Sequence, residues 1–312
     1  MIMKINRFAI YSWFVLIYNI FIILWGAYVR ATGSGAGCGS HWPLCNGEVI
    51  PRSPQIETVI ELAHRLTSGI ALILVLLMLI FAFRNYPKGN LVRKGAVLSM
   101  VFIIMEALVG AGLVLFEWVG DDASSGRVIS IALHLINTFI LLAFLTLTAW
   151  WISTESKMHF TGRKLLASVF ILGFLGVILI GVTGAITALG DTLFPSKSIF
   201  EGIQGDFSNS AHLLIRLRIW HPIIAVIVGF YLMFLSVMTS LFFEDEWVKR
   251  FSWILFSGVI LQLLAGIVNL ILLAPIWMQI VHLFLADFVW ITLTLLFAAN
   301  FSYLHRKNEN NH

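Results

Sequence analysis

Eight long apolar segments constrain this chain more than any other feature of its sequence. They lie near residues 11–30, 57–82, 95–117, 128–151, 165–187, 218–242, 252–273 and 278–303. Each is long enough to cross a bilayer as a helix. Only 12% of the residues are charged, whereas a soluble domain carries roughly 25%. The first segment lacks a small-residue cleavage site and is expected to stay as a membrane helix. The sequence therefore predicts an all-α integral membrane protein with eight transmembrane helices.

The positive charges predict the orientation of these helices. Eight helices place both termini on one side, and 13 of the 20 lysines and arginines fall on that side: Lys4, Arg7, Arg84, Lys88, Arg93, Lys94, Lys157, Arg163, Lys164, Lys249, Arg250, Arg306 and Lys307. The positive-inside rule makes that side cytoplasmic, in a multi-pass protein of the cell membrane. The outer connections are then 31–56, 118–127, 188–217 and 274–277. Because the cations cluster in short loops, the net charge of +4 does not indicate nucleic-acid binding.

The two halves of the chain resemble each other, which indicates an internal repeat. The matching segments and residues are 25–33 with 183–190, 106–110 with 262–266, His64 with His221, and His134 with His282. Four helices per half is an even number, so both copies would point the same way across the membrane. We therefore expect two pseudo-symmetric four-helix bundles, at residues 1–155 and 156–312.

Four histidines occupy matching positions on the even-numbered segments: His64, His134, His221 and His282. Each lies near the start of a segment that enters from the outside, so all four are expected toward the outer face. Two imidazoles facing each other across a bundle suit the axial positions of one haem iron. The scarcity of carboxylate and thiolate clusters disfavours zinc or di-iron sites. Alternatively, these histidines bond to neighbouring helices or face a water-filled vestibule. The other histidines are expected to be solvated: His41, His159, His212, His305 and His312.

Other ionisable residues gather around the first of these histidines. Helical spacing puts Glu61 and His64 on one face, with Arg65 beside them. Four arginines at the outer rim could pair with the anionic propionates of a haem, or could snorkel to lipid headgroups. These arginines are Arg30, Arg65, Arg216 and Arg218. Glu106 and Asp287 are expected near mid-membrane, either on a proton path or as neutral, hydrogen-bonded acids.

The only cysteines, Cys38 and Cys45, lie in one glycine-rich outer connection. On the oxidising side of the membrane, two cysteines this close predict a disulfide. The sequence leaves open whether that disulfide is a structural clip or has a redox role.

Taken together, these residues resemble haem A synthase over nearly the whole chain. The resemblance is carried by residues 26–35, the Cys38/Cys45 loop with Trp42-Pro43-Leu44-Cys45, Glu61-x-x-His64-Arg65, residues 184–192 and the order of the four histidines. It implies oxidation of the C8 methyl of haem O to a formyl group, giving haem A for terminal oxidases. It also implies that the first half holds the substrate haem O between His64 and His134, and that the second half holds a resident haem b between His221 and His282.

The resemblance implies partners as well. These are haem O and haem A, a membrane-bound haem O synthase that hands over the substrate, and an electron donor or acceptor of unknown identity. Assembly into a homo-oligomer is left open. Two features depart from the family pattern: the second cysteine pair of some members is absent, and His221 is followed by Pro222. Proline suits the first turn of a helix, which allows the sixth helix to begin after residue 218.

A mechanism follows as a hypothesis. Two successive oxidations would convert the methyl first to an alcohol and then to the aldehyde. Water is the expected co-substrate, but the sequence leaves the source of the formyl oxygen open. Glu61 would lie beside the reacting methyl, where it could take a proton or stabilise positive charge. Alternatively, Glu61 only orients His64 or pairs with Arg65. The equivalent position in the second half is Arg218, three residues before His221. A cation there suits a resident haem that relays electrons.

Three other classes of protein share some of these features. A di-haem membrane cytochrome b that passes electrons from quinol to a partner would also use paired histidines, but it does not need Glu61 beside a ligand. A transporter with parallel repeats would predict helix breaks at mid-membrane. A purely structural membrane subunit would not need so many ionisable groups.

Overall fold

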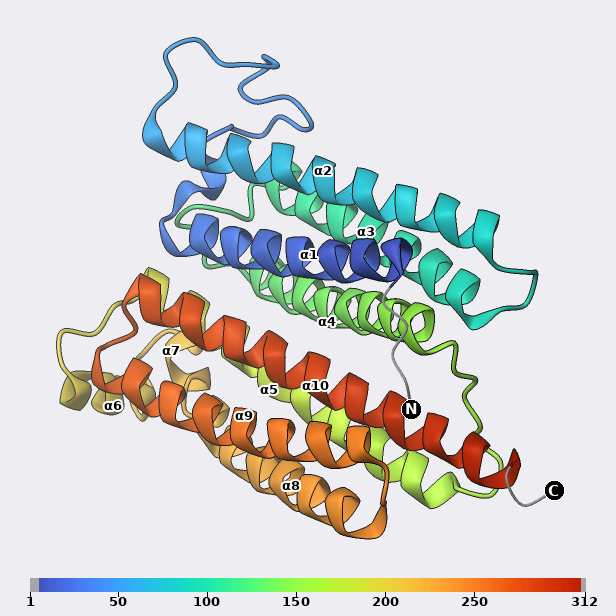
Figure 1. Ribbon diagram of the computed structural model, residues 1–312. Helices are drawn as coiled ribbons and strands as arrows, with labels where there is room; N and C mark the ends of the chain where they lie inside the picture. The colour runs from blue at the N-terminus through green and yellow to red at the C-terminus, as the bar shows by residue number, and fades with distance from the viewer. Residues whose placement is uncertain (1–5, 310–312) are drawn as a thin grey trace.

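Eight antiparallel membrane-spanning segments make up this protein (Figure 1). The computed structural model describes residues 6–309, with side chains for 6–302. The spanning helices within that range are α1 (Arg7–Ala31), α2 (Ile56–Asn85), α3 (Leu91–Leu115), α4 (Ser125–Thr154), α5 (Lys164–Leu193), the pair α7 (Leu213–Leu217) and α8 (Trp220–Phe242), α9 (Glu246–Ile271) and α10 (Ile276–Glu309). Two short helices, η1 (Ser34–Ala36) and α6 (Ile199–Asp206), lie in the connections between α1 and α2 and between α5 and α7. The predicted all-α membrane class and its eight spans are confirmed.

Polar caps start several helices earlier than the apolar runs indicate. The Asn90 side chain accepts a hydrogen bond from the backbone N–H of Val92, so α3 begins at Leu91. The Asp245 side chain caps α9 in the same way, accepting hydrogen bonds from the backbone N–H groups of Trp247 and Val248. A cap satisfies N–H groups that would otherwise lack a partner in the first turn. The predicted starts at 95 and 252 were therefore too late, because hydropathy alone does not register a polar first turn.

The outer connection predicted at 188–217 was wrong in its extent. Helix α5 continues to Leu193, and α6 and α7 occupy much of the remainder. Ser198 caps α6 by accepting from the N–H of Glu201. Helix α8 begins at Trp220, which puts Pro222 in its first turn. A proline there costs little, since that N–H would have no helical partner.

The helices form two groups that meet along four of their members. Helices α1 to α4 lie together, and α5 lies with α8, α9 and α10 (Figure 1). Between the groups, α4 packs against α5 and α10, and α1 packs against α10. We call residues 1–155 the first half and residues 156–312 the second half. The division at this point and the symmetry between the halves stay predictions.

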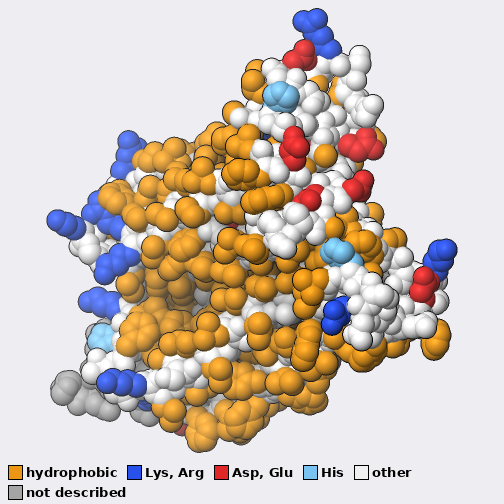
Figure 2. Space-filling view, turned by 180° about the vertical axis from the view of Figure 1, so that it is seen from behind, with side chains coloured by type: hydrophobic (Ala, Val, Ile, Leu, Met, Phe, Trp, Pro, Cys, Tyr) orange, Lys and Arg blue, Asp and Glu red, His pale blue; other side chains and the backbone are white. Residues whose placement is uncertain are grey.

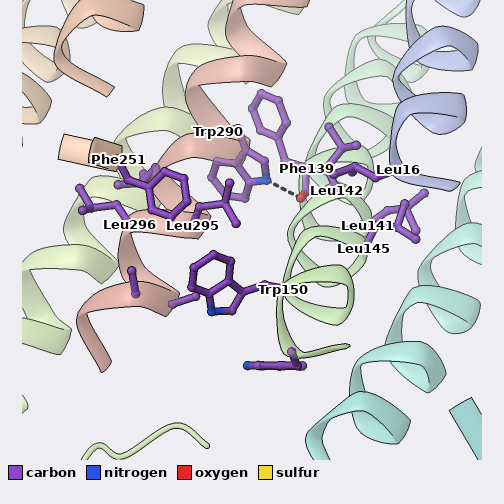
Figure 3. Packing of buried hydrophobic residues seen from close by; sticks show 14 of the residues in the cluster. Leu16, Phe139, Leu141, Leu142, Leu145, Trp150, Phe251, Trp290, Leu295 and Leu296 are labelled. Carbon is purple, nitrogen blue, oxygen red and sulfur yellow. Dashed lines mark hydrogen bonds between the residues drawn. The ribbon is translucent and has the colours of Figure 1, made fainter. Parts of the chain in front are cut away.

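An aromatic contact forms the centre of the packing between the halves. Phe139 of α4 stacks on Trp290 of α10 with ring centroids 4.8 Å apart (Figure 3). The indole Nε1 of Trp290 donates to the carbonyl oxygen of Phe139 at 2.6 Å. Helix α5 approaches closely here, because a Cβ added at Gly181 would lie 2.6 Å from the Phe139 ring. The contact joins the two groups of helices at a buried hydrogen bond.

The surface divides into an apolar band and two polar ends. Figure 2 shows hydrophobic side chains over the middle of the molecule, with lysines and arginines gathered at one end and acidic side chains toward the other. Many large apolar residues are exposed on this band, among them Ile17, Leu175 and Phe234. In a membrane protein the lipid tails cover such residues, so they need no protein partner.

We expect Trp290→Phe to lower the free energy of unfolding by about 1–3 kcal/mol, because it removes the indole N–H and leaves a small void. Circular dichroism of the detergent-solubilised protein during heating measures the change as a lower Tm. Trp253 is the matched control, since its side chain is 55% exposed on α9. Equal Tm values for Trp290→Phe and Trp253→Phe would show that the contact between Phe139 and Trp290 does not stabilise the fold.

Candidate functional site

The four predicted histidines each lie against a glycine of the internal repeat. His64 is on α2, His134 on α4, His221 on α8 and His282 on α10. The distances from a Cβ added at each glycine to the nearest ring carbon are 3.0 Å for Gly26 to His64, 3.9 Å for Gly110 to His134, 2.9 Å for Gly184 to His221 and 3.2 Å for Gly266 to His282. Each imidazole therefore occupies space that a side chain at the glycine position would need, most tightly at Gly26, Gly184 and Gly266.

In the second half the two imidazoles face each other. The ring centroids of His221 and His282 lie 6.2 Å apart, with ring planes at 88°. That separation accommodates one metal ion at about 2 Å from a nitrogen of each ring. Thr183 Oγ1 lies 3.3 Å from Nδ1 of His221, and Gln262 Nε2 lies 3.3 Å from Nε2 of His282. These groups sit where they can orient the two rings.

In the first half a carboxylate takes the place of that glutamine. Oε1 of Glu106 lies 3.3 Å from Nδ1 of His134. The same carboxylate accepts hydrogen bonds from Asn137 Nδ2 and, at 2.5 Å, from Thr138 Oγ1. The first pair of histidines thus has a neighbouring acid that the second pair lacks.

Glu61 is almost fully buried and is bonded on both carboxylate oxygens. One oxygen accepts the backbone N–H of Cys38 at 2.8 Å. The other accepts from Nε and Nη2 of Arg65, one turn further along α2. The side chains of Glu61 and Arg65 are only 4% and 11% exposed. A charge-assisted pair of this kind is short and geometrically defined, so the carboxylate has a fixed orientation on the helix that carries His64.

The loop that contains the cysteines is clamped onto the start of α2. The predicted disulfide between Cys38 and Cys45 is present. Nη1 of Arg65 donates to the carbonyl oxygens of His41 and Leu44, each at 2.6 Å. On the other side of the loop, Thr58 Oγ1 donates to the carbonyl of Gly37 at 2.7 Å. Gly37 lies so near the backbone of α2 that a Cβ there would be 2.5 Å from it. The disulfide loop and the Glu61 carboxylate therefore form one hydrogen-bonded unit.

The predicted rim arginines have different surroundings. Arg30 crosses to the second half, where it donates to the Ala188 carbonyl at 2.7 Å, to Thr192 Oγ1 at 3.0 Å and to Gln279 Oε1 at 2.8 Å. Arg216 is exposed on α7, and Arg65 holds Glu61 as described. Any role of these arginines toward a propionate stays a prediction.

Arg218 is bound by two aspartates. Its Nη1 donates to Asp191 at 2.9 Å, and its Nε and Nη2 lie 3.0 Å from Asp206. These pairs fix α6 and the end of α5 against the start of α8. Burial raises the pKa of Asp206, and the Arg218 guanidinium opposes that rise. The cation predicted near His221 is thus present, but its charge is compensated locally.

The remaining predicted residues are placed as follows. Asp287 is 1% exposed, and neither of its oxygens has a hydrogen-bond partner among the described residues. His41, His159 and His212 are exposed in outer or inner connections, as expected. The side chains of His305 and His312 lie outside the described residues.

The residues present are compatible with a haem group in each half. Each half supplies two histidines whose rings pack against a neighbouring helix at a glycine. The Nδ1 atoms of His64, His134 and His282 are buried without a hydrogen-bond partner in the described part of the chain. Such buried imidazole nitrogens are costly unless something binds the ring. The assignment of the four histidines as iron ligands stays a prediction.

Several residues around the site could not be found from the sequence. Asn137, Thr138 and Thr183 are ordinary polar residues in apolar helices, and only the packing brings them to a histidine or to Glu106. Arg127 was also missed. It is 3% exposed and donates to the carbonyl oxygens of Gly120 and Asp122. A buried charge in a membrane helix is the signal that could have identified it.

Two of the relatives found among known proteins carry names that refer to haem. A Thermus thermophilus protein named protoheme IX farnesyltransferase is 47% identical over 275 residues, which are 88% of this chain and 45% of that protein. Heme A synthase of Bacillus cereus is 48% identical over 97 residues, which are 31% of each chain. The matched part is therefore less than half the length of either relative.

A family model covers far more of the sequence than the Bacillus match does. The model is COX15-CtaA, described as cytochrome oxidase assembly protein, and it matches residues 9–294. The resemblance noted from the motifs is thus confirmed at the level of the family. Because the match spans nearly all of the sequence, this chain belongs to the COX15-CtaA family of cytochrome oxidase assembly proteins.

Proposed function

We propose that this chain is a haem A synthase, which oxidises the C8 methyl of haem O to a formyl group. The observation that carries the proposal is the Glu61 carboxylate, buried and bonded on both oxygens in the same helix as His64. The name of the Bacillus relative supports the same activity. A cytochrome that only transfers electrons has no need for an oriented acid at one of its two histidine pairs.

The overall conversion balances with water as the oxygen source. A methyl group and one water give a formyl group, four protons and four electrons. The protons need acceptors near the substrate, and the electrons need an acceptor outside the chain. Glu61 is suited to the first task because its carboxylate already accepts hydrogen bonds at a fixed position. In a low-dielectric site the same negative charge stabilises positive charge that develops at the methyl carbon.

The first half would hold the reacting haem, and the second half would hold the haem that relays electrons. His64 and His134 would hold the iron of haem O in the first half, and His221 and His282 would hold a haem b in the second. That haem b, when bound, supplies a one-electron relay. The second half has no acid at the position of Glu61; Arg218 stands there and is paired with Asp191 and Asp206. This difference supports a reacting site in the first half only.

The proposed orientation puts the disulfide loop and the four histidines near the outer face of the cell membrane, with both termini in the cytoplasm. The gathering of lysines and arginines at the opposite end supports it (Figure 2). The break between α7 and α8 lies at the outer start of its span, not at mid-membrane where a transporter would need one.

A haem O synthase is the proposed source of the substrate. The Thermus relative is named protoheme IX farnesyltransferase, and this chain matches only 45% of it. In that relative a segment like this chain is therefore continuous with a larger protein of that name. A physical link of this kind supports direct handover of haem O within the membrane.

We expect Glu61→Gln to retain both haems but to abolish the formation of haem A, because the amide cannot take a proton or balance positive charge. Haems extracted from the purified protein, separated by chromatography with mass detection, measure this. Glu57→Gln is the matched control, since Glu57 lies exposed one turn earlier on α2. A normal yield of haem A from Glu61→Gln would remove Glu61 from the mechanism.

We expect Cys45→Ser to lower haem A yield while both haems stay bound. Opening a loop of this length removes about 2–3 kcal/mol of stabilisation in the chain-entropy model, which loosens the Cys38 N–H that holds Glu61. Thermal unfolding and haem analysis of the same sample separate the two effects. Unchanged yield after loss of the disulfide would mean that Arg65 alone suffices to hold the carboxylate.

We expect His221→Leu or His282→Leu to remove the haem b spectrum and to leave haem O in the preparation. The loss follows if each histidine is one of two axial ligands, since either change breaks the pair. Optical spectra of the reduced protein and haem extraction give the two readings. An unaltered haem b content in both variants would refute the ligand assignment in the second half.

A further inference from the structure

The two halves differ in the residue that contacts the histidine on their last helix. In the first half this residue is Glu106, whose carboxylate lies 3.3 Å from Nδ1 of His134. In the second half Gln262 occupies the matching place in the sequence, but its amide nitrogen lies 3.3 Å from the other ring nitrogen, Nε2 of His282. The backbones are alike at both positions, since each residue lies four positions before a glycine that faces the histidine. The difference is therefore one of charge and hydrogen bonding.

The surroundings of Glu106 hold its carboxylate in place. Thr138, one turn after His134 on α4, donates to Oε1, and Asn137 donates to Oε2. Asn137 also donates to the carbonyl of Phe102 on α3, which ties the two helices together. With both oxygens engaged as acceptors, the carboxylate lies at ion-pair distance from Nδ1 of His134, without the alignment of a hydrogen bond. A rotation of the ring would bring an Nδ1 proton onto the carboxylate and leave Nε2 free to bind a metal.

We propose that Glu106 is a positioning residue for the substrate haem, holding His134 through Nδ1 and making its Nε2 a stronger electron donor to the iron. This inference rests on the proposed function. A carboxylate hydrogen-bonded to a ligating histidine raises the basicity of that ligand. A more basic ligand stabilises ferric over ferrous iron, so the haem in the first half has the lower reduction potential of the two sites for a given porphyrin. An electron removed from the substrate then moves toward the second half.

The test is a redox titration of the purified full-length protein, loaded in cells that also make haem O and followed by optical spectroscopy. Each haem gives one component of the titration curve. The component that His134→Met removes or shifts belongs to the first half, and the component that His282→Met removes or shifts belongs to the second half. Glu106→Gln keeps the side-chain shape and can still accept from Thr138, so the helix packing is preserved. We expect it to raise the midpoint potential of the first-half component alone. If the substitution weakens the preference for ferric over ferrous iron tenfold, the midpoint potential rises by about 59 mV, the value for a one-electron couple.

Gln262→Glu is the matched variant, because it puts a carboxylate beside the other histidine. It should lower the midpoint potential of the second-half component and leave the first unchanged. If Glu106→Gln moves neither component, or if both variants move both components equally, Glu106 is only a packing contact and the inference is wrong. If instead His134→Met leaves both components unchanged, His134 is not a ligand. That result would overturn the ligand assignment itself, and the role of Glu106 with it.

Discussion

The Glu61 carboxylate is buried at the start of a membrane helix, where an unpaired charge would cost several kcal/mol of free energy. The structure meets this cost with Arg65 and with the backbone N–H of Cys38. Because one of these partners lies in the disulfide loop, the fold of an outer connection and the orientation of a buried acid depend on each other. The glycine at position 37 makes the arrangement possible, since no larger residue fits against the backbone of α2.

The two halves place their histidines in a similar way, but the charged residues around these histidines differ. Each half presents two histidines whose rings pack against glycines of neighbouring helices. The neighbouring residues are not repeated: the first half has Glu61 and Glu106, and the second has Arg218 and Gln262. If the halves arose by duplication, as predicted, divergence of these neighbouring residues would give one site a reaction and leave the other a relay.

The contact between the halves combines apolar packing with a few buried polar bonds. Trp290 bonds to a carbonyl of α4 within an aromatic cluster (Figure 3). Arg30 bonds to the end of α5 and to Gln279 of α10. In lipid, apolar surface alone gives helices little reason to associate. Hydrogen bonds and close packing must therefore supply the specificity that keeps the two groups of helices in register, and with it the distance between the proposed haem sites.

The sequence by itself determined the membrane class, the number of spans, the disulfide and the four histidine positions. These follow from local properties: apolar length, cysteine spacing in an outer loop, and repetition along the chain. Only the tertiary structure decided how the charges are paired. Arg30 as a bridge between the halves, Arg218 held by two aspartates, and Glu106 against His134 all join residues far apart in the sequence. Hydropathy and spacing do not report such pairs, because a buried charge finds its partner through helix packing, which is set by the whole fold.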